Sequence, residues 1–236
     1  MKLAKLPFIN VMSRTQRNFG LIFLFIFTFG VPSGLAILSY TMEGFAELSE
    51  YTIEAIGYAF SLTVLLLGMY NYLKLSFNIM MESKVRSFYV LLLSIMIYGL
   101  LVFALSFALM FFMNDPMAFE LGDGSAYPEY GFSAMFMLTC VAYPVVQDIL
   151  FRGVVFGYLR RFGRIKSYVF STAIYIAALL WPGFAFDYSP MLLLQALQLG
   201  MDNIVYCWCY ERSSSIWTVI IFHMIENAIV LFFMFA

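Results

Sequence analysis

Long apolar stretches follow one another along almost the whole chain and are separated by short polar segments. Each stretch is long enough to cross the hydrocarbon core of a bilayer as an α-helix, which takes about 20 residues. The stretches occupy residues 19–40, 55–73, 88–113, 131–159, 167–186, 190–210 and 215–236. This pattern predicts an all-α fold, a polytopic membrane helix bundle with about seven transmembrane helices.

Composition supports this prediction. Of the 236 residues, 63% are hydrophobic and only 11% are charged, whereas a soluble domain has about 25% charged residues. We therefore expect a single membrane domain over residues 1–236, with no separate soluble part. The net charge of −1 argues against nucleic acid as a partner. Cys140, Cys207 and Cys209 are expected to stay reduced as packing residues.

Basic residues gather in every second connection. Twelve of the 13 Lys and Arg residues lie in segments 2–17, 74–86 and 160–166 or at Arg212. The alternate connections contain Asp and Glu but no Lys or Arg. Because cytoplasmic loops are enriched in Lys and Arg, the amino terminus is predicted to be cytoplasmic. The connection at 114–130, which is rich in Gly and Pro, is predicted to be an exposed loop.

The remaining basic residue, Arg152, lies inside a predicted span together with Gln147 and Asp148. Charges in a membrane are costly and are usually paired and turned inward. Asp148 and Arg152 are four residues apart, so they lie on one helix face and can neutralise each other. Taken alone, this pair is equally consistent with a plain ion pair and with a functional site.

Two later spans also carry polar residues. His223 and Asn227 share a face of the last span, and the sixth carries a stripe of Gln195, Gln198 and Asp202. At 1.5 Å per residue, Asp148, Asp202 and His223 lie roughly 13 to 18 Å from their nearest cytoplasmic anchors, which are Arg160, Glu211 and Arg212. This common depth favours one polar cavity open to the cytoplasm, although the glutamines and Asn227 also suit plain interhelical packing.

Glu226 lies three residues after His223. It suits either a position on the outer surface or a role as a partner of Arg152. We favour the surface position.

Three motifs resemble one known family. The segment from Gln147 through Phe151, Arg152 and Gly153 is similar to the Glu-Glu-x-x-x-Arg signature of the CPBP (Abi, CAAX prenyl protease 2-like) intramembrane endopeptidases. A Glu-Arg-x-x-Ser segment begins at Glu211, and His223 and Asn227 form a His-x-x-x-Asn pair, in the family's order and spacing. The resemblance covers about residues 143–231, within a family-like core at 131–236, while residues 1–130 match only in being hydrophobic.

The resemblance implies metal-independent peptide hydrolysis with no cofactor. In the family, the first Glu acts as a base on water, a histidine on the next helix assists it, and the His-x-x-x-Asn pair stabilises the oxyanion. Arg152, His223 and Asn227 match the family's positions, but Gln147 replaces the base and Leu179, four residues after Tyr175, replaces the assisting histidine. A carboxamide has no lone pair basic enough to take a proton from water near neutral pH.

The first hypothesis is therefore a cavity that binds a membrane peptide or protein without efficient hydrolysis. The catalytic motif positions are Gln147, Asp148, Arg152, His223 and Asn227. The expected binding residues are Asp202, Gln198, Tyr175 and Leu179. An alternative is an active endopeptidase that uses Asp148 or Asp202 as base. A third hypothesis is an ion or solute pathway along the stripe. Expected partners are membrane lipid and a membrane protein or lipidated peptide, and the family implies a bacterial plasma membrane.

Overall fold

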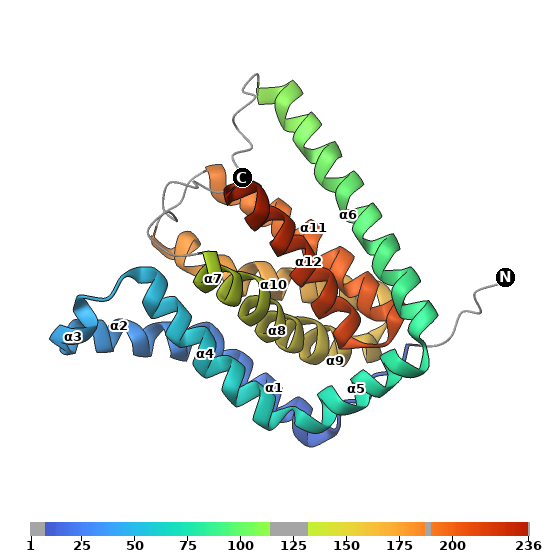
Figure 1. Ribbon diagram of the computed structural model, residues 1–236, viewed down its shortest axis with the longest axis horizontal. Coiled ribbons are helices and arrows are strands. Elements are labelled where there is room, and N and C mark those ends of the chain that lie inside the picture. The colour runs from blue at the N-terminus through green and yellow to red at the C-terminus, as the bar shows by residue number, and fades with distance from the viewer. Residues whose placement is uncertain (1–7, 114–131, 187–189, 236) are drawn as a thin grey trace.

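The computed structural model describes residues 8–113, 132–186 and 190–235. The predicted loop at 114–130 lies outside these residues. All regular elements within the described ranges are helices (Figure 1). The N-terminal half contains α1 (Arg14–Phe25), η1 (Ile26–Gly30), α2 (Val31–Thr41), α3 (Glu43–Ala46), α4 (Glu50–Gly68), α5 (Tyr70–Glu82) and α6 (Lys84–Met113).

The C-terminal half contains one long, irregular helix followed by three regular ones. The irregular helix consists of α7 (Phe132–Met135), η3 (Phe136–Ala142), α8 (Tyr143–Gln147), η4 (Asp148–Phe156), α9 (Gly157–Leu159) and η5 (Arg160–Phe162). The regular helices are α10 (Arg164–Phe186), α11 (Pro190–Ser213) and α12 (Ile216–Phe235). The expected all-α membrane bundle is confirmed.

Five segments of the described residues are long and apolar enough to cross a membrane: Arg14–Thr41, Tyr51–Gly68, Lys84–Ala108, Phe132–Phe162 and Ile216–Phe233. The fifth and sixth expected spans are present as helices α10 and α11 but are not among these five. In α11 the polar residues Gln195, Gln198, Asp202 and Asn203 lower the mean hydropathy. The total of seven spans stays a prediction.

Prolines explain two irregularities in the long helices. Pro32 follows the π-helical segment η1, and Pro144 follows the π-helical segment η3. Proline has no N–H for the bond to the preceding turn, and its ring clashes with the carbonyl four residues earlier. The wider π-helical turns just before both prolines relieve this clash while the helix continues.

The second expected span is shorter than its hydropathy pattern suggests. The apolar pattern runs to Leu73, but α4 ends at Gly68 and the amphipathic helix α5 begins at Tyr70 (Figure 1). A Cβ atom at Gly68 would collide with the ring of Phe19, so glycine lets α1 and α4 approach closely at this break. Helix α5 buries Tyr72, Leu73 and Ser76 against the rest of the bundle.

The irregular helix at 132–162 lies at the centre of the fold. Its apolar stretch is 67% buried, whereas the other four candidate spans reach at most 39%. Val146, Ile149, Leu150, Phe151 and Val154 are almost completely buried in the main hydrophobic core. Helices α10, α11 and α12 and the N-terminal helices α1 and α4 surround this element, so polar side chains on it face protein rather than lipid.

Candidate functional site

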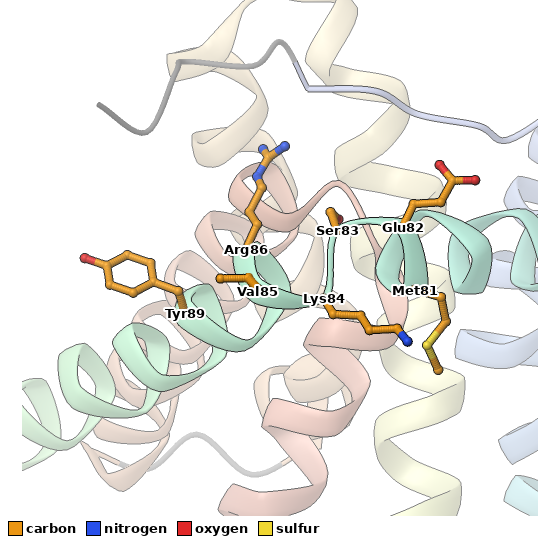
Figure 2. A pocket seen from close by; sticks show the side chains of 7 residues that line it. All are labelled: Met81, Glu82, Ser83, Lys84, Val85, Arg86 and Tyr89. Atoms are coloured by element: carbon orange, nitrogen blue, oxygen red, sulfur yellow. The ribbon is translucent and has the colours of Figure 1, made fainter. Parts of the chain in front are cut away.

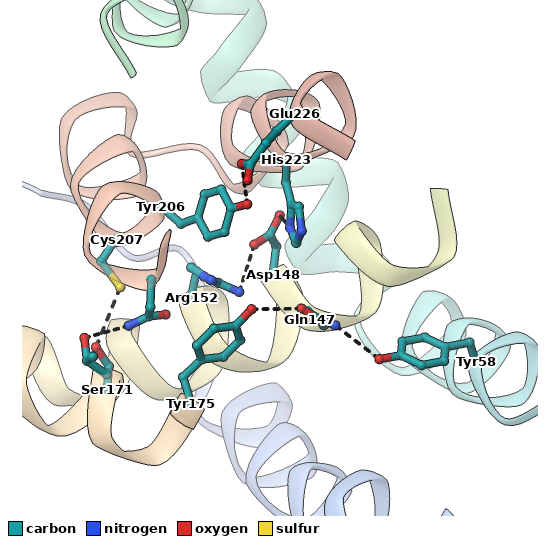
Figure 3. Close-up of polar contacts among 12 residues, drawn as sticks. Tyr58, Gln147, Asp148, Arg152, Ser171, Tyr175, Tyr206, Cys207, His223 and Glu226 are labelled. Carbon is teal, nitrogen blue, oxygen red and sulfur yellow. Dashed lines mark hydrogen bonds and ion pairs between the residues drawn. The ribbon is translucent and has the colours of Figure 1, made fainter. Parts of the chain in front are cut away.

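The ion pair predicted between Asp148 and Arg152 is present at the centre of the bundle. The Arg152 NH1 atom lies 3.3 Å from the Asp148 Oδ1 atom, and both side chains are fully buried in η4. An isolated charge in this environment would be very costly, so each side chain compensates the buried charge of the other. The pair is the fixed centre around which the other polar residues lie (Figure 3).

Two tyrosine rings enclose the guanidinium group of Arg152. Its Cζ atom lies 4.3 Å from the ring centroid of Tyr175 on α10 and 4.4 Å from that of Tyr206 on α11. Cation–π contacts of this kind stabilise by about 2 kcal/mol when the cation is desolvated. The ring faces of Tyr175 and Tyr206 thus hold the guanidinium group of Arg152 between α10 and α11.

His223 approaches the same carboxylate from α12. Its Nδ1 atom lies 3.4 Å from the Asp148 Oδ2 atom, and its ring stacks on Tyr206 with centroids 4.6 Å apart. Asp148 is therefore shared by Arg152 and His223, which come from different helices. This carboxylate can orient the imidazole, the function that a carboxylate performs beside a histidine in many hydrolytic sites.

Gln147 connects two helices on the other side of the cluster. Its Nε2 atom donates to the Tyr58 hydroxyl of α4 at 3.1 Å, and its Oε1 atom accepts from the Tyr175 hydroxyl at 3.0 Å. Both polar atoms of the carboxamide are thus engaged with tyrosines, and the side chain is almost completely buried. Figure 3 shows this chain of hydrogen bonds from Tyr58 to Tyr175.

A second pair of acids lies next to the Arg152 centre. Asp202 on α11 is buried, and Glu226 on α12 accepts a hydrogen bond from the Tyr206 hydroxyl at 2.5 Å. The phenol of Tyr98 on α6 lies beside both carboxylates. The surface position that we favour for Glu226 from the sequence is therefore wrong: its carboxylate turns inward because Tyr206 offers it a donor.

Other predicted residues lie outside this cluster. Asn227 donates to the Thr139 carbonyl in η3 at 2.6 Å, so its amide joins two helices, as interhelical packing predicts. Leu179 is half-buried against the hydrophobic core. Gln198 is half-buried and Gln195 is exposed, so only Asp202 of the expected stripe joins the polar cluster.

Several buried polar atoms of the cluster make no hydrogen bond to the described residues. They are the carboxylate oxygens of Asp148, all three guanidinium nitrogens of Arg152, Oδ1 of Asp202 and Nδ1 of His223. Buried polar groups are nearly always hydrogen-bonded, and each one left unpaired costs about 1–3 kcal/mol. Their concentration at one place is typical of a site that receives polar groups from a ligand. Among the described residues, no three His, Cys, Asp or Glu side chains gather as a metal site.

Sequence reasoning named Tyr175 as a binding residue but missed three other tyrosines of this site, Tyr58, Tyr98 and Tyr206. Tyr206 follows Asp202 by four residues and so shares its helix face, a signal that was available in the sequence. Tyr58 and Tyr98 lie on the N-terminal helices α4 and α6 and reach the site only through tertiary packing. Nothing in their local sequence distinguishes them from tyrosines at a membrane interface.

A family model of type II CAAX prenyl endopeptidase Rce1-like proteins matches residues 129–229. The matched segment contains Gln147, Asp148, Arg152, His223 and Asn227, and the match confirms the resemblance that these motifs indicate. The protein is therefore a helical membrane protein in which residues 129–229 are similar to the Rce1-like domain of CAAX proteases. A search of curated proteins and a search of solved structures each returned no match.

Proposed function

We propose that the polar cluster binds a segment of a membrane protein or a lipidated peptide and does not hydrolyse it efficiently. The observation that carries the proposal is the state of Gln147, which stands where the family has its base. Its carboxamide donates to Tyr58 and accepts from Tyr175, so it is a structural bridge between α4 and α10. A group in this state does not take a proton from water.

Retention of the other motif residues supports binding. Arg152, Asp148 and His223 lie together in a buried part of the bundle, and their donors and acceptors are in ion-pair contact but make no hydrogen bond to the described residues. A peptide group offers one donor and one acceptor, which suits such a mixed set. In a low-dielectric environment these hydrogen bonds are strong, because water competes little for them.

The test measures binding and cleavage in the same preparation. A fluorescent farnesylated peptide is added to the detergent-purified protein; anisotropy reports binding, and mass spectrometry reports products. We expect saturable binding without product. Binding should weaken about tenfold in His223→Ala, the loss expected for one hydrogen bond to a charged or strongly polar group.

The matched control is Gln195→Ala, which changes an exposed polar residue of α11. It should bind like the wild type. Absence of binding, or equal affinities of the two variants, would count against the proposal. Product formation that is abolished in His223→Ala would instead identify an active protease.

An active endopeptidase with Asp202 as base is the second candidate. It is supported by the burial of Asp202 and by its unpaired Oδ1 atom, whereas Asp148 is already engaged by Arg152 and His223. Asp202→Asn should then abolish peptide hydrolysis while leaving the fold intact. Turnover that is unchanged in this variant removes the candidate.

The proposal includes a location in a bacterial plasma membrane, which rests on the family resemblance alone. Fractionation of cells that express the tagged chain tests it. The protein should sediment with the inner-membrane fraction; recovery in another membrane contradicts this part of the proposal.

A further inference from the structure

The corner between α5 and α6 contains an open pocket of about 830 Å³. It is lined by residues 81–86, at the end of α5 and the start of α6, and by Tyr89 one turn further along α6 (Figure 2). This pocket is separate from the polar cluster around Arg152, and its lining residues lie outside the family motifs; Arg212, which lies beside it, is the arginine of the Glu-Arg-x-x-Ser segment.

Three basic side chains gather in or beside this pocket. Lys84 is exposed and Arg86 is half-buried in its wall, and Arg212 from the end of α11 lies close enough to Arg86 for the two cations to repel each other. Within the described residues these three side chains make no ion pair. Glu82 also lines the pocket, but its carboxylate points away from the guanidinium of Arg86 (Figure 2).

Three other arginines, by contrast, have acidic partners. Arg160 and Arg164 both bind the carboxylate of Glu211, and Arg152 pairs with Asp148. Lys84, Arg86 and Arg212 have no such partner, so the α5–α6 corner has an excess of positive charge among the described residues. Such an excess, brought together from distant parts of the chain, is complementary to an anion.

The flank of α6 next to the pocket is apolar and open. Val85 is 75% exposed and Phe88 is 61% exposed, at the start of a candidate span that is only 11% buried. Tyr89 is half exposed on the same stretch. Cations at the end of a span beside exposed apolar side chains fit one kind of ligand, a molecule with an anionic head and an acyl tail.

We propose that this corner is a binding site for an anionic phospholipid. The phosphate group lies among Lys84, Arg86 and Arg212, and an acyl chain lies along Val85 and Phe88. The basic connection at 74–86 is on the predicted cytoplasmic side, where the leaflet carries anionic lipids. The site is independent of the proposed function of the polar cluster. A free phosphate ion would use the cations but not the apolar flank.

The experiment measures the affinity of the detergent-purified full chain for phosphatidylglycerol and for phosphatidylcholine by native mass spectrometry. Phosphatidylglycerol should bind more tightly to the wild type. The double variant Lys84→Gln/Arg212→Gln should lose about 25-fold in affinity for it, since each basic side chain near anionic lipid contributes roughly 1 kcal/mol, or about fivefold. Both side chains are exposed, so the variant should elute and melt like the wild type.

The control variant Lys74→Gln/Lys166→Gln removes the same charge from exposed positions outside the pocket. It should change the affinity less than twofold. An equal loss in both variants would mean diffuse attraction rather than a site and would overturn the proposal, as would no loss in either. Arg86→Gln tests the same pocket through a third side chain and should weaken binding about fivefold.

Soluble competitors separate lipid from a free anion. Inorganic phosphate and glycerol phosphate carry the charge but lack the acyl chains. We expect that neither displaces phosphatidylglycerol at equal concentration. Displacement by inorganic phosphate at that concentration would show an anion site with no preference for lipid, and the proposal would be wrong.

Discussion

The guanidinium of Arg152 is fully buried, with a tyrosine ring on each face and the Asp148 carboxylate beside it. This arrangement gives one side chain contacts with three separate helical elements, η4, α10 and α11. A lysine would keep the charge but could not stack in the same way, because its ammonium group is neither planar nor delocalised. Arg152 therefore contributes to packing as well as to charge balance.

Breaking this pair on one side only should be strongly destabilising. Arg152→Met leaves Asp148 as an uncompensated buried charge, so we expect the free energy of unfolding to fall by about 3–5 kcal/mol. Titration of the purified protein with sodium dodecyl sulfate measures it. In the double variant Asp148→Asn/Arg152→Met both charges are gone, and the loss should be less than half as large. Equal losses in the single and double variants would show that the pair itself adds nothing.

Gln147 offers a test of the proposed loss of hydrolysis. Gln147→Glu with Leu179→His installs the family's base and its assisting histidine, one helical turn beyond Tyr175. Since general acid–base catalysis contributes about 100- to 10,000-fold, cleavage of a farnesylated peptide should rise at least about 100-fold above that of the wild type. Product formation is measured by mass spectrometry.

The gain should depend on the rest of the site. Adding His223→Ala to the double variant should return cleavage to the wild-type level, whereas adding Gln195→Ala should not. If the double variant stays inactive although it folds, the defect lies beyond the two replaced residues, and the explanation based on Gln147 and Leu179 is insufficient.

The connection between helices α11 and α12 is held by specific hydrogen bonds to helix α5. Ser214 adopts a left-handed backbone conformation with φ of 57° between α11 and α12. The first amide of α12, at Ile216, donates to the Ser76 side chain of α5 at 2.8 Å, and the Ser215 hydroxyl donates to the Ser76 carbonyl at 2.9 Å. A serine of one helix thus caps the amino-terminal end of another, far away in the chain. This joins α5 to the helix that carries His223.

Loss of this cap should destabilise the bundle. Ser76→Ala removes the acceptor for the Ile216 amide inside the protein, and we expect a loss of about 1–2 kcal/mol in the free energy of unfolding. The matched control is Ser39→Ala, because Ser39 is only half-buried and bonds only to carbonyls of its own helix α2. Its effect should stay within about 0.5 kcal/mol. Similar losses in the two variants, measured by titration with sodium dodecyl sulfate, would argue against the capping role.

The sequence predicts features that depend on local residues and misses those that depend on contacts with other helices. Apolar length and i,i+4 spacing are local properties, so the helices and the Asp148–Arg152 pair could be predicted. The break after Gly68 could not, because it depends on Phe19 approaching from another helix. The inward turn of Glu226 depends in the same way on Tyr206, and the amide of Asn227 is directed by a carbonyl of η3. Where a side chain points is decided by partners that the local sequence does not contain.

At the scale of the whole molecule, the polar cluster draws on nearly every major helix. Gln147 reaches α4 and α10, His223 comes from α12, and Tyr98 comes from α6. The N-terminal helices resemble the family only in hydrophobicity, yet Tyr58 and Tyr98 give them direct contact with the site. The segment matched by the family model therefore does not make up the site alone.

Cysteine labelling can determine whether helices α10 and α11 cross the membrane. These helices have 23 and 24 residues, about 35 Å at 1.5 Å per residue, which exceeds the roughly 30 Å of hydrocarbon. We expect both to cross despite the polar residues of α11, because Asp202 and Asn203 are buried against protein. A cysteine placed at Asp187, between the two helices, should then react with an impermeant maleimide added outside intact cells.

The background in this experiment should be low, since the native cysteines Cys140, Cys207 and Cys209 are all buried. Lys166→Cys, on the predicted cytoplasmic side, serves as the control and should react only after the membrane is permeabilised. If Asp187→Cys also needs permeabilisation, α10 and α11 do not cross. The protein would then have the five spans that hydropathy identifies in the described residues, and Asp202 would reach Arg152 from a hairpin that enters and leaves on the cytoplasmic side.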